Sequence, residues 1–344
     1  MNLPHSVVRG VGTVRLIALI ALIACSRAPS GSGSDTQEHA EHSGSSATAA
    51  ANVRPSVSTG QAQYMLLGVL NPLLHPYLQV LGDHFGGEGQ TPFAVQRVDL
   101  AGGRRALLVS RANETDPLLL VSEGAQLIWS KGQPLVGLGE PLVHPALTPG
   151  SDGGAALFAY STSSHSVQAR TWKRDGTASA DHRVLSMEGC DALSAACGEI
   201  FGWIVVCVLP SATRAQRLTP DGATPWGDAG AAVGVPSGPP TIVFDTPGTW
   251  MLVATAKKGD QDHLLAFRYD ARGQPLWPDA ADIGVVHATS RGVRPSAALT
   301  SSGAVRIDLP GGVAGSHANA ADVDSAGAVH LIELPRNLAG RLQP

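Results

Sequence analysis

The side chains of this 344-residue chain with the most distinctive chemistry are four thiols, at Cys25, Cys190, Cys197 and Cys207. A thiol can be modified covalently, can pair in a disulfide or can bind a metal ion. Cys25 differs from the others because it follows two arginines and the apolar run Leu16–Ala24. A basic start, a short apolar segment and a small residue before the cleavage point are typical of a secretory signal. A membrane-spanning helix needs about 20 apolar residues, so this run is too short to remain as an anchor.

The stretch Leu22-Ile23-Ala24-Cys25 resembles the lipobox of bacterial lipoproteins. The resemblance implies that residues 1–24 are a lipoprotein signal peptide and that Cys25 is lipidated and becomes the first mature residue. Ser26 follows the cysteine, at the position where that family uses aspartate for retention in the inner membrane. We therefore expect a cell-envelope protein held by a lipid anchor in the outer membrane of a Gram-negative bacterium.

The three remaining cysteines are expected to lie in an oxidising compartment, where a disulfide is the default state. Cys207 lies in the apolar run 203–209 and is expected to be a buried strand residue. Cys190 and Cys197 flank the loop-like stretch DALSAA, so we expect these two to pair. Three reduced thiols and a metal site are the alternatives, and the close Cys-x-x-Cys spacing of a metal site is absent.

Residues 25–60 are expected to form a flexible tether, because they are rich in Ser, Gly, Ala and Thr and show no apolar periodicity. One stretch, DTQEHAEH, carries side chains that could chelate zinc or copper weakly. These side chains are Asp35, Glu38, His39, Glu41 and His42. Ordering them would cost chain entropy, so we expect a solvated tether with no metal and no cofactor.

No sequence motif identifies catalytic residues. The chain has no Gly-x-Ser-x-Gly elbow and no His-Glu-x-x-His motif, and its other histidines are isolated from one another. Asp322 and Asp324 come closest to a calcium loop but lack the further ligands. Asp245 and Asp270 lie near strand-like runs and are the candidates for glycoside hydrolysis, which needs two carboxylates about 5–9 Å apart. We expect a binding protein, with a hydrolase or lyase as the alternative.

The composition favours an all-β domain. Gly and Pro are abundant, with 40 and 24 residues, while the hydrophobic content of 43% is enough for a folded core. The net charge of −4 and the absence of a basic patch argue against nucleic-acid binding. The short β-rich runs between turn residues predict strands throughout residues 61–344.

A repeat of about 50 residues organises this domain. It is marked by five turn glycines, at 124, 176, 222, 273 and 327. Three of them precede a tryptophan, and we expect these pairs to pack between neighbouring sheets, with a carbohydrate-binding platform as the alternative role of the tryptophans. The pairs are Gly124 with Trp129, Gly222 with Trp226, and Gly273 with Trp277.

The period is the size of a four-stranded propeller blade, so we expect a β-propeller of five blades, or of six if residues 61–100 form a degenerate one. Residues 64–70 could complete the last blade beside residues 329–334. A pair of β-sandwiches is the alternative.

Two segments carry a family resemblance, LLAFRYDARGQPLWPDAADIG and AQRLTPDGATPWGDAGAAVG. They resemble the degenerate propeller repeats of secreted proteins and lipoproteins from Gram-negative bacteria. The Gly-x-x-x-Trp element is similar to the tryptophan-docking element of quinoprotein-type propellers. The resemblance implies the fold alone. The repeat architecture, the tether and the lack of a catalytic motif predict a lipid-anchored envelope binding or scaffold module, whose partners are the membrane and an envelope protein or polysaccharide. The hydrolase or lyase alternative would act on such a polysaccharide.

Overall fold

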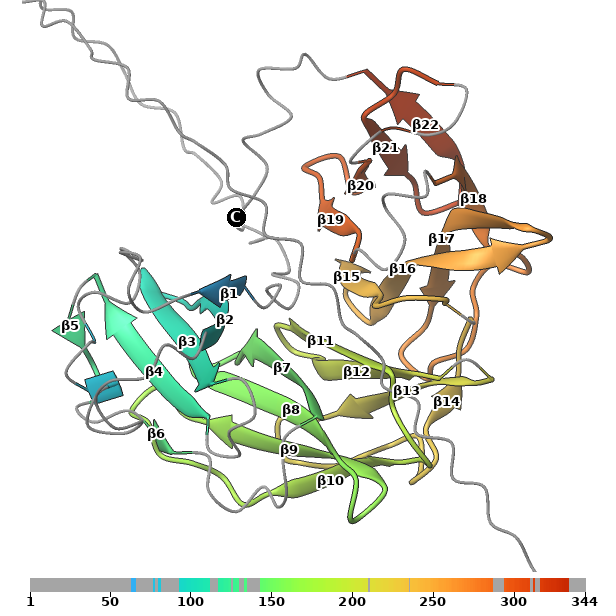
Figure 1. The fold of residues 1–344 in the computed structure, drawn as a ribbon. Coiled ribbons are helices and arrows are strands. Elements are labelled where there is room, and N and C mark those ends of the chain that lie inside the picture. The colour runs from blue at the N-terminus through green and yellow to red at the C-terminus, as the bar shows by residue number, and fades with distance from the viewer. Residues whose placement is uncertain are drawn as a thin grey trace, which may run out of the picture. The chain divides into compact units, whose positions relative to one another are not determined.

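The computed structural model describes residues 63–65, 77, 80–81, 93–111, 117–124, 126–129, 133–134, 143–209, 211–234, 236–286, 294–309, 312 and 316–333. The expected signal peptide, the tether and Cys25 lie outside the described residues. The described part is all-β and folds into five antiparallel sheets that follow one another along the chain (Figure 1). It holds no helix of sufficient length and apolarity to cross a membrane.

The five sheets are numbered here in chain order. Sheet 1 contains β1 (Gln63–Met65), β2 (Phe93–Asp99), β3 (Arg104–Arg111), β4 (Leu118–Glu123), β5 (Gln126–Leu127) and β6 (Gln133–Pro134). Sheet 2 contains β7 (Val143–Pro149), β8 (Ala155–Ser161), β9 (Ser166–Trp172) and β10 (His182–Ser186). Sheet 3 contains β11 (Ala192–Gly198), β12 (Gly202–Val208), β13 (Thr213–Leu218) and β14 (Ala231–Ala232). Sheet 4 contains β15 (Thr241–Thr246), β16 (Thr249–Lys258), β17 (Gln261–Tyr269) and β18 (Ala281–Val285). Sheet 5 contains β19 (Ser296–Leu299), β20 (Val305–Asp308), β21 (Ala320–Val323) and β22 (Val329–Ile332).

Sheets 2 to 5 share one topology, in which each strand pairs with the next along the chain. Sheet 1 differs because β1 adds to the free edge of β2, with Tyr64 opposite Ala94. The expected pairing of Tyr64 and Met65 with the last strand of the chain is therefore wrong. The reason is local, since β2 already offers an unpaired edge to this segment.

In sheets 2 to 5, a turn that contains a glycine follows the third strand. Gly176, Gly222, Gly273 and Gly327 all have φ between 75° and 89°, which glycine adopts without steric cost. In each turn the glycine N–H donates to the carbonyl oxygen three residues earlier, as Gly273 does to Asp270 at 3.1 Å. The repeat in the sequence is thus the repeat of this turn.

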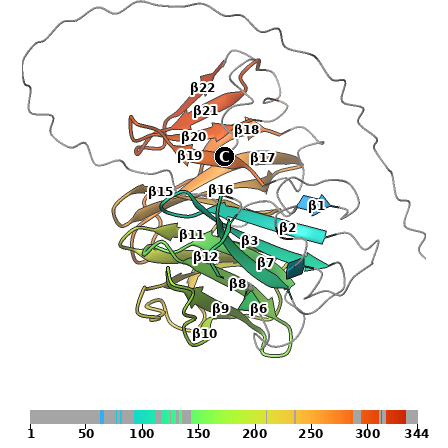
Figure 2. The ribbon, with the colours of Figure 1, turned by 90° about the vertical axis from the view of Figure 1, so that its left-hand side faces the viewer.

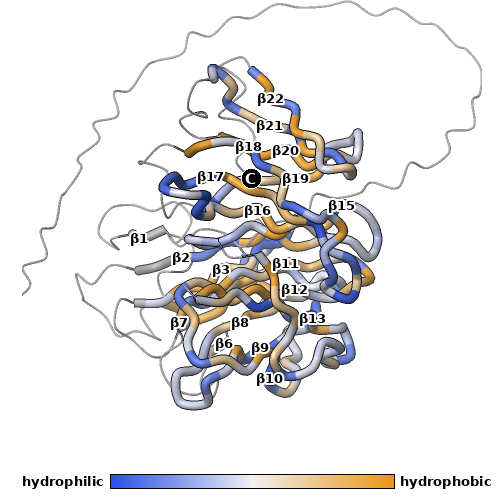
Figure 3. The backbone as a smooth tube through the Cα atoms, turned by 90° about the vertical axis from the view of Figure 1, so that its right-hand side faces the viewer, coloured by the Kyte–Doolittle hydropathy of each residue, from blue (hydrophilic) through white to orange (hydrophobic). Residues whose placement is uncertain are grey.

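The core lies in layers between successive sheets. The second strands β8 and β12 are buried at every position because apolar side chains cover both faces. Phe158 and Trp203 pack in the layer between sheets 2 and 3, and Met251 and Ile307 pack in the layer between sheets 4 and 5. Figure 3 shows hydrophobic colour along strands such as β8 and hydrophilic colour at many of the turns. Burial of these side chains is the main term that stabilises the stack.

The first strands of successive sheets contact one another. The contacts join β2 to β7, β7 to β11, β11 to β15, and β15 to β19 (Figures 1 and 2). Chain order and spatial order therefore agree across the five sheets. This arrangement is compatible with five propeller blades.

The outer faces of the two end sheets differ in polarity. On sheet 5, the face away from sheet 4 is polar, with an ion pair of 2.7 Å between Arg306 and Asp322 and a 2.9 Å hydrogen bond from Ser296 to Asp308. On sheet 1, the face away from sheet 2 is apolar and is covered by Tyr77 and Leu81. Sheets 2, 3 and 4 have apolar residues on both faces.

Candidate functional site

Three tryptophans each pack against the turn glycine of the next sheet along the chain. A Cβ added at Gly176 would come within 2.9 Å of Trp129, and one at Gly327 within 3.3 Å of Trp277. Trp226 lies on Gly273 in the same way, and its Nε1 donates to Ala271 O at 3.2 Å. These tryptophans therefore fill the junctions between sheets.

Three positions depart from this pattern. His182 takes the place of the tryptophan at Gly222, where an added Cβ would meet its ring at 2.5 Å. Trp129 Nε1 is buried and has no acceptor in the described part of the chain. The corresponding carbonyl, Arg174 O, instead accepts from Arg104 Nη1 at 3.2 Å. Gly124 has φ of 59° and no described atom near an added Cβ.

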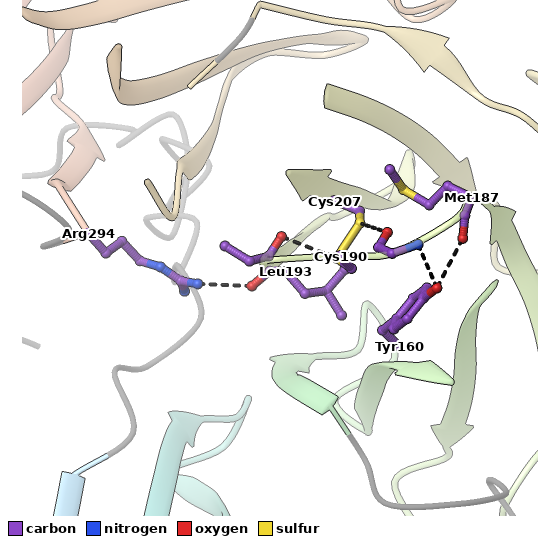
Figure 4. Close-up of a disulfide and its surroundings, with 8 residues drawn as sticks. Tyr160, Met187, Cys190, Leu193, Cys207 and Arg294 are labelled. Atoms are coloured by element: carbon purple, nitrogen blue, oxygen red, sulfur yellow. Dashed lines mark hydrogen bonds between the residues drawn. A yellow bond between two sulfur atoms is a disulfide. The ribbon is translucent and has the colours of Figure 1, made fainter. Parts of the chain in front are cut away.

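The disulfide joins Cys190 to Cys207, with Cα atoms 5.6 Å apart (Figure 4). The predicted pair of Cys190 and Cys197 is wrong. Residues 192–198 form the strand β11 and not a loop, so an extended chain separates the two by about 20 Å. A disulfide requires Cα atoms within about 7 Å. The β11–β12 hairpin instead returns Cys207 beside the start of β11, where it lies opposite Leu193.

Cys197 is a free, partly buried thiol near the tip of the same hairpin. Burial, followed by the negative charges of Asp152 and Glu199, raises the pKa of Cys197 to about 12. A thiolate is the reactive form of cysteine, so this residue is chemically inert near neutral pH.

The two candidate catalytic acids have structural partners. Asp245 is buried and accepts from Arg268 Nε at 2.7 Å and from the hydroxyl of Thr249. Asp270 caps its turn by accepting the backbone N–H groups of Arg272 and Gln274, both at 2.8 Å. Neither carboxylate is positioned as a free acid or base, so neither supports the hydrolase alternative.

Asp322 and Asp324 do not act together as metal ligands. Asp322 forms the ion pair with Arg306, whereas Asp324 caps a turn through the N–H groups of Ala326 and Ala328. The described residues contain no group of three or more His, Cys, Asp or Glu side chains that could hold a metal ion. The histidine–carboxylate cluster predicted in the tether lies outside them.

One histidine is paired with an acid. His263 Nδ1 lies 2.9 Å from Asp282 Oδ1, and Lys258 Nζ donates to Asp282 Oδ2 at 2.7 Å. Burial alone would raise the pKa of Asp282, but the hydrogen bonds from Lys258 and His263 outweigh it and lower that pKa. This cluster joins β16, β17 and β18 across the surface of sheet 4.

Polar side chains on the first strands link neighbouring sheets. Gln96 Nε2 donates to Pro145 O at 2.6 Å, and Ser194 Oγ donates to Pro240 O at 2.7 Å. Thr241 donates to Pro295 O in the same manner. Each proline lies in, or directly before, the first strand of the next sheet. These bonds fix the spacing of the first strands.

Arg294, directly before sheet 5, reaches sheet 3. Its Nη2 donates to Leu193 O at 3.1 Å and to Ser194 Oγ at 2.9 Å, and Figure 4 shows the first of these bonds. Burial lowers the pKa of Arg294 to about 10. The arginine therefore remains charged at neutral pH and ties two non-consecutive sheets together.

A pocket of about 550 Å³ lies where sheets 3 and 4 meet. Its volume falls within the range of small-molecule sites. Its lining combines donor groups with apolar walls and, among the described residues, includes no carboxylate. The lining residues are Arg217, Pro225, Trp226, Gly230, Ala231, Ala271, Arg272 and Gln274. Sequence reasoning found Trp226 and missed the arginines, which no motif marks.

Arg217 and Arg268 occupy matching places in sheets 3 and 4. Arg217 directly precedes Leu218, which pairs with Trp203 of the second strand of sheet 3. Arg268 directly precedes Tyr269, which pairs with Trp250 of the second strand of sheet 4. Arg268 is neutralised by Asp245, which is the extra residue of a β-bulge in β15. The pairing of β11 with β12 has no bulge, so Arg217 lacks this carboxylate. Its Nε donates to Phe201 O at 2.8 Å, and its guanidinium lies 3.9 Å above the Phe201 ring.

A comparison of the chain with protein-family models and with curated proteins finds no match. The fold defines a class, an all-β protein of five antiparallel sheets.

Proposed function

We propose that this protein is a lipid-anchored envelope module that binds a ligand in the pocket between sheets 3 and 4. The observation that carries the proposal is the pocket, whose described lining residues include two arginines and no acid. A charged side chain that a fold leaves unpaired in a concave site is a candidate ligand-binding group. The acids considered for catalysis, Asp245 and Asp270, are used to hold strands and turns instead.

We further propose that the five sheets form a five-bladed propeller. Four successive junctions support it, since each brings first strands together and buries apolar side chains. The fifth junction would join sheet 5 to sheet 1 and would be polar on the side of sheet 5. Closure would remove sheet edges that otherwise invite aggregation.

Ring closure is tested with spin labels at positions 97 and 298, which lie on the outer faces of sheets 1 and 5. The closed ring predicts a distance distribution similar to that of a reference pair on the adjacent sheets 3 and 4, at positions 232 and 274. A clearly longer distance for the 97–298 pair would contradict closure.

The anchor is proposed from Cys25 and the residues around it. In this proposal Cys25 carries the lipid, and Ser26 leaves the protein free to reach the outer membrane. The Cys25→Ser variant should leave the membrane fraction, and an unchanged membrane fraction would contradict lipid anchoring.

Binding is tested by capture from envelope extract. The Cys25→Ser protein, immobilised without its lipid, should retain an envelope protein or polysaccharide, and a matched protein with Arg217→Met and Arg272→Met should retain less. Equal capture by both proteins would contradict the pocket as the binding site.

A further inference from the structure

We propose that the pocket between sheets 3 and 4 binds a uronic acid unit of an acidic polysaccharide, with Arg217 and Arg272 receiving its carboxylate. This inference rests on the proposed binding function and names the ligand class of the same pocket. It depends on the charge of the pocket, on the rigidity of its walls and on the chemistry of its lining.

The charge of the pocket favours an anion. Among the described residues, Arg217 makes a side-chain hydrogen bond only to Phe201 O, through Nε. Its two terminal nitrogens are thus available, and these are the groups that bind a carboxylate in a bidentate manner. Arg272 lies in the exposed turn after β17, and its side chain makes no hydrogen bond to any residue that the structure describes.

Within the described part of the chain, Asp221 is the acid that influences Arg217 electrostatically, and it does not line the pocket. Asp221 lies in the exposed turn after β13, and its pKa is lowered chiefly by a hydrogen bond with Thr219 and by backbone N–H groups. Burial lowers the pKa of Arg217, and Asp221 acts in the opposite direction. A carboxylate ligand would supply the counter-charge that Asp245 supplies to Arg268 in sheet 4.

The wall of the pocket that sheet 3 supplies is held in place before any ligand arrives. The buried Gln216 donates to Gly227 O through Nε2, while its Oε1 accepts the N–H groups of Trp226 at 3.3 Å and of Arg217 at 2.8 Å. Gly230 lies against Ala215, where an added Cβ would come within 2.3 Å of the carbonyl oxygen. A fixed pocket loses little conformational entropy on binding.

The lining chemistry favours a sugar acid over a simple ion. The polar side chains are Arg217, Arg272 and Gln274, all of which can donate hydrogen bonds to a ligand. Hydroxyl and carboxylate oxygens of a uronic acid can accept them. Pro225 and Trp226, whose indole stacks on Trp250, supply apolar surface that the carbon atoms of a sugar ring can contact. A pocket of this size also exceeds what a single small anion would fill.

The experiment is a calorimetric titration of the Cys25→Ser protein with three oligosaccharide probes. They are trigalacturonate, its methyl ester and neutral maltotriose. We expect trigalacturonate to bind at least tenfold more tightly than the methyl ester, because the ester removes the charge and keeps the ring. Binding should also weaken as salt is raised. Equal affinity for the acid and the ester would overturn the proposal.

Variants assign the binding to the pocket. Arg217→Met should weaken trigalacturonate binding about tenfold to a hundredfold, since a hydrogen bond to a charged group is lost. The matched control is Arg214→Met, on the same strand but outside the pocket lining. A similar loss in both variants would overturn the assignment. If Arg217→Met does not fold, the comparison of acid and ester on the unaltered pocket still decides the charge requirement.

The remaining outcomes separate this inference from the function on which it rests. An acidic peptide that binds the pocket more tightly than trigalacturonate would overturn the sugar-acid assignment. Capture of an envelope component without any binding of the acidic sugar would overturn this inference and leave the binding function standing. No capture and no binding would overturn both.

Discussion

Trp226 of sheet 3 lies on Gly273 of sheet 4, with Cζ3 only 3.3 Å from where a Cβ of residue 273 would be. The indole Nε1 donates to Ala271 O at 3.2 Å in the same turn. The glycine serves two purposes at this point, because its φ of 75° shapes the turn and its missing side chain admits the ring. The same relationship recurs for Trp129 with Gly176 and for Trp277 with Gly327.

Gly273→Ala should therefore destabilise the protein for two reasons. A left-handed backbone costs a non-glycine residue about 1–2 kcal/mol. Crowding against Trp226 and against the Ala231 Cβ, which would lie 2.9 Å away, adds about 1–3 kcal/mol. Urea unfolding followed by tryptophan fluorescence measures the sum.

The control for this substitution is Gly259→Ala. Gly259 has a similar φ of 63° and no described atom within 4 Å of an added Cβ. It should show the backbone cost alone. Equal destabilisation by the two substitutions would mean that the tryptophan contact does not contribute.

The repeat could be predicted from the sequence because its marker is local. A turn glycine needs positive φ, and this requirement leaves a glycine at nearly the same place in each period. The all-β class followed from the same turns and from the short apolar runs between them.

The cysteine pairing could not be predicted from the sequence. Ala195 and Ala196 suggest a loop, yet both are fully buried in β11, where small side chains fit between packed sheets. The pocket was missed for a related reason. In sheet 4 a β-bulge places Asp245 beside Arg268 and neutralises it. Sheet 3 has no such bulge, so Arg217 keeps its charge without this partner. Residue spacing does not reveal a bulge.

The Cys190–Cys207 disulfide should stabilise the folded state by about 3 kcal/mol, since it closes a loop of 17 residues. Cys190→Ser with Cys207→Ser should lower the free energy of unfolding by that amount. Peptide mapping of the unreduced protein should recover the 190–207 link. A link from Cys197 to either cysteine would contradict the structure.

Cys197 should make stability depend on alkaline pH. Its pKa is about 12 in the folded protein and near its ordinary value of 9.0 in the unfolded chain. The folded state therefore favours the neutral thiol. This contribution is complete below pH 9 and is lost as pH rises towards 12, because the unfolded thiol ionises first.

Cys197→Ser removes this contribution. Burial also raises the pKa of Tyr269 to about 12, which acts with the same sign. Tyr269 is present in both proteins, so the difference between their pH profiles isolates the thiol. Parallel profiles between pH 8 and pH 11 would contradict the assignment.

Asp245→Asn should lower stability by about 3 kcal/mol, because it leaves the guanidinium of Arg268 partly buried without its carboxylate partner. The Asp245 side chain is only 1% exposed, so water cannot replace it easily. Arg268 would keep its 2.7 Å hydrogen bond to Ser325 O, which limits the loss. Asp260→Asn, in the exposed turn between β16 and β17, is the matched control and should change the free energy of unfolding by less than about 0.5 kcal/mol. Thermal unfolding of the unaltered protein and the two variants measures both changes in stability. An Asp245→Asn protein as stable as the unaltered one would mean that this carboxylate is not needed to hold sheet 4. Asp245 would then again be a candidate functional acid.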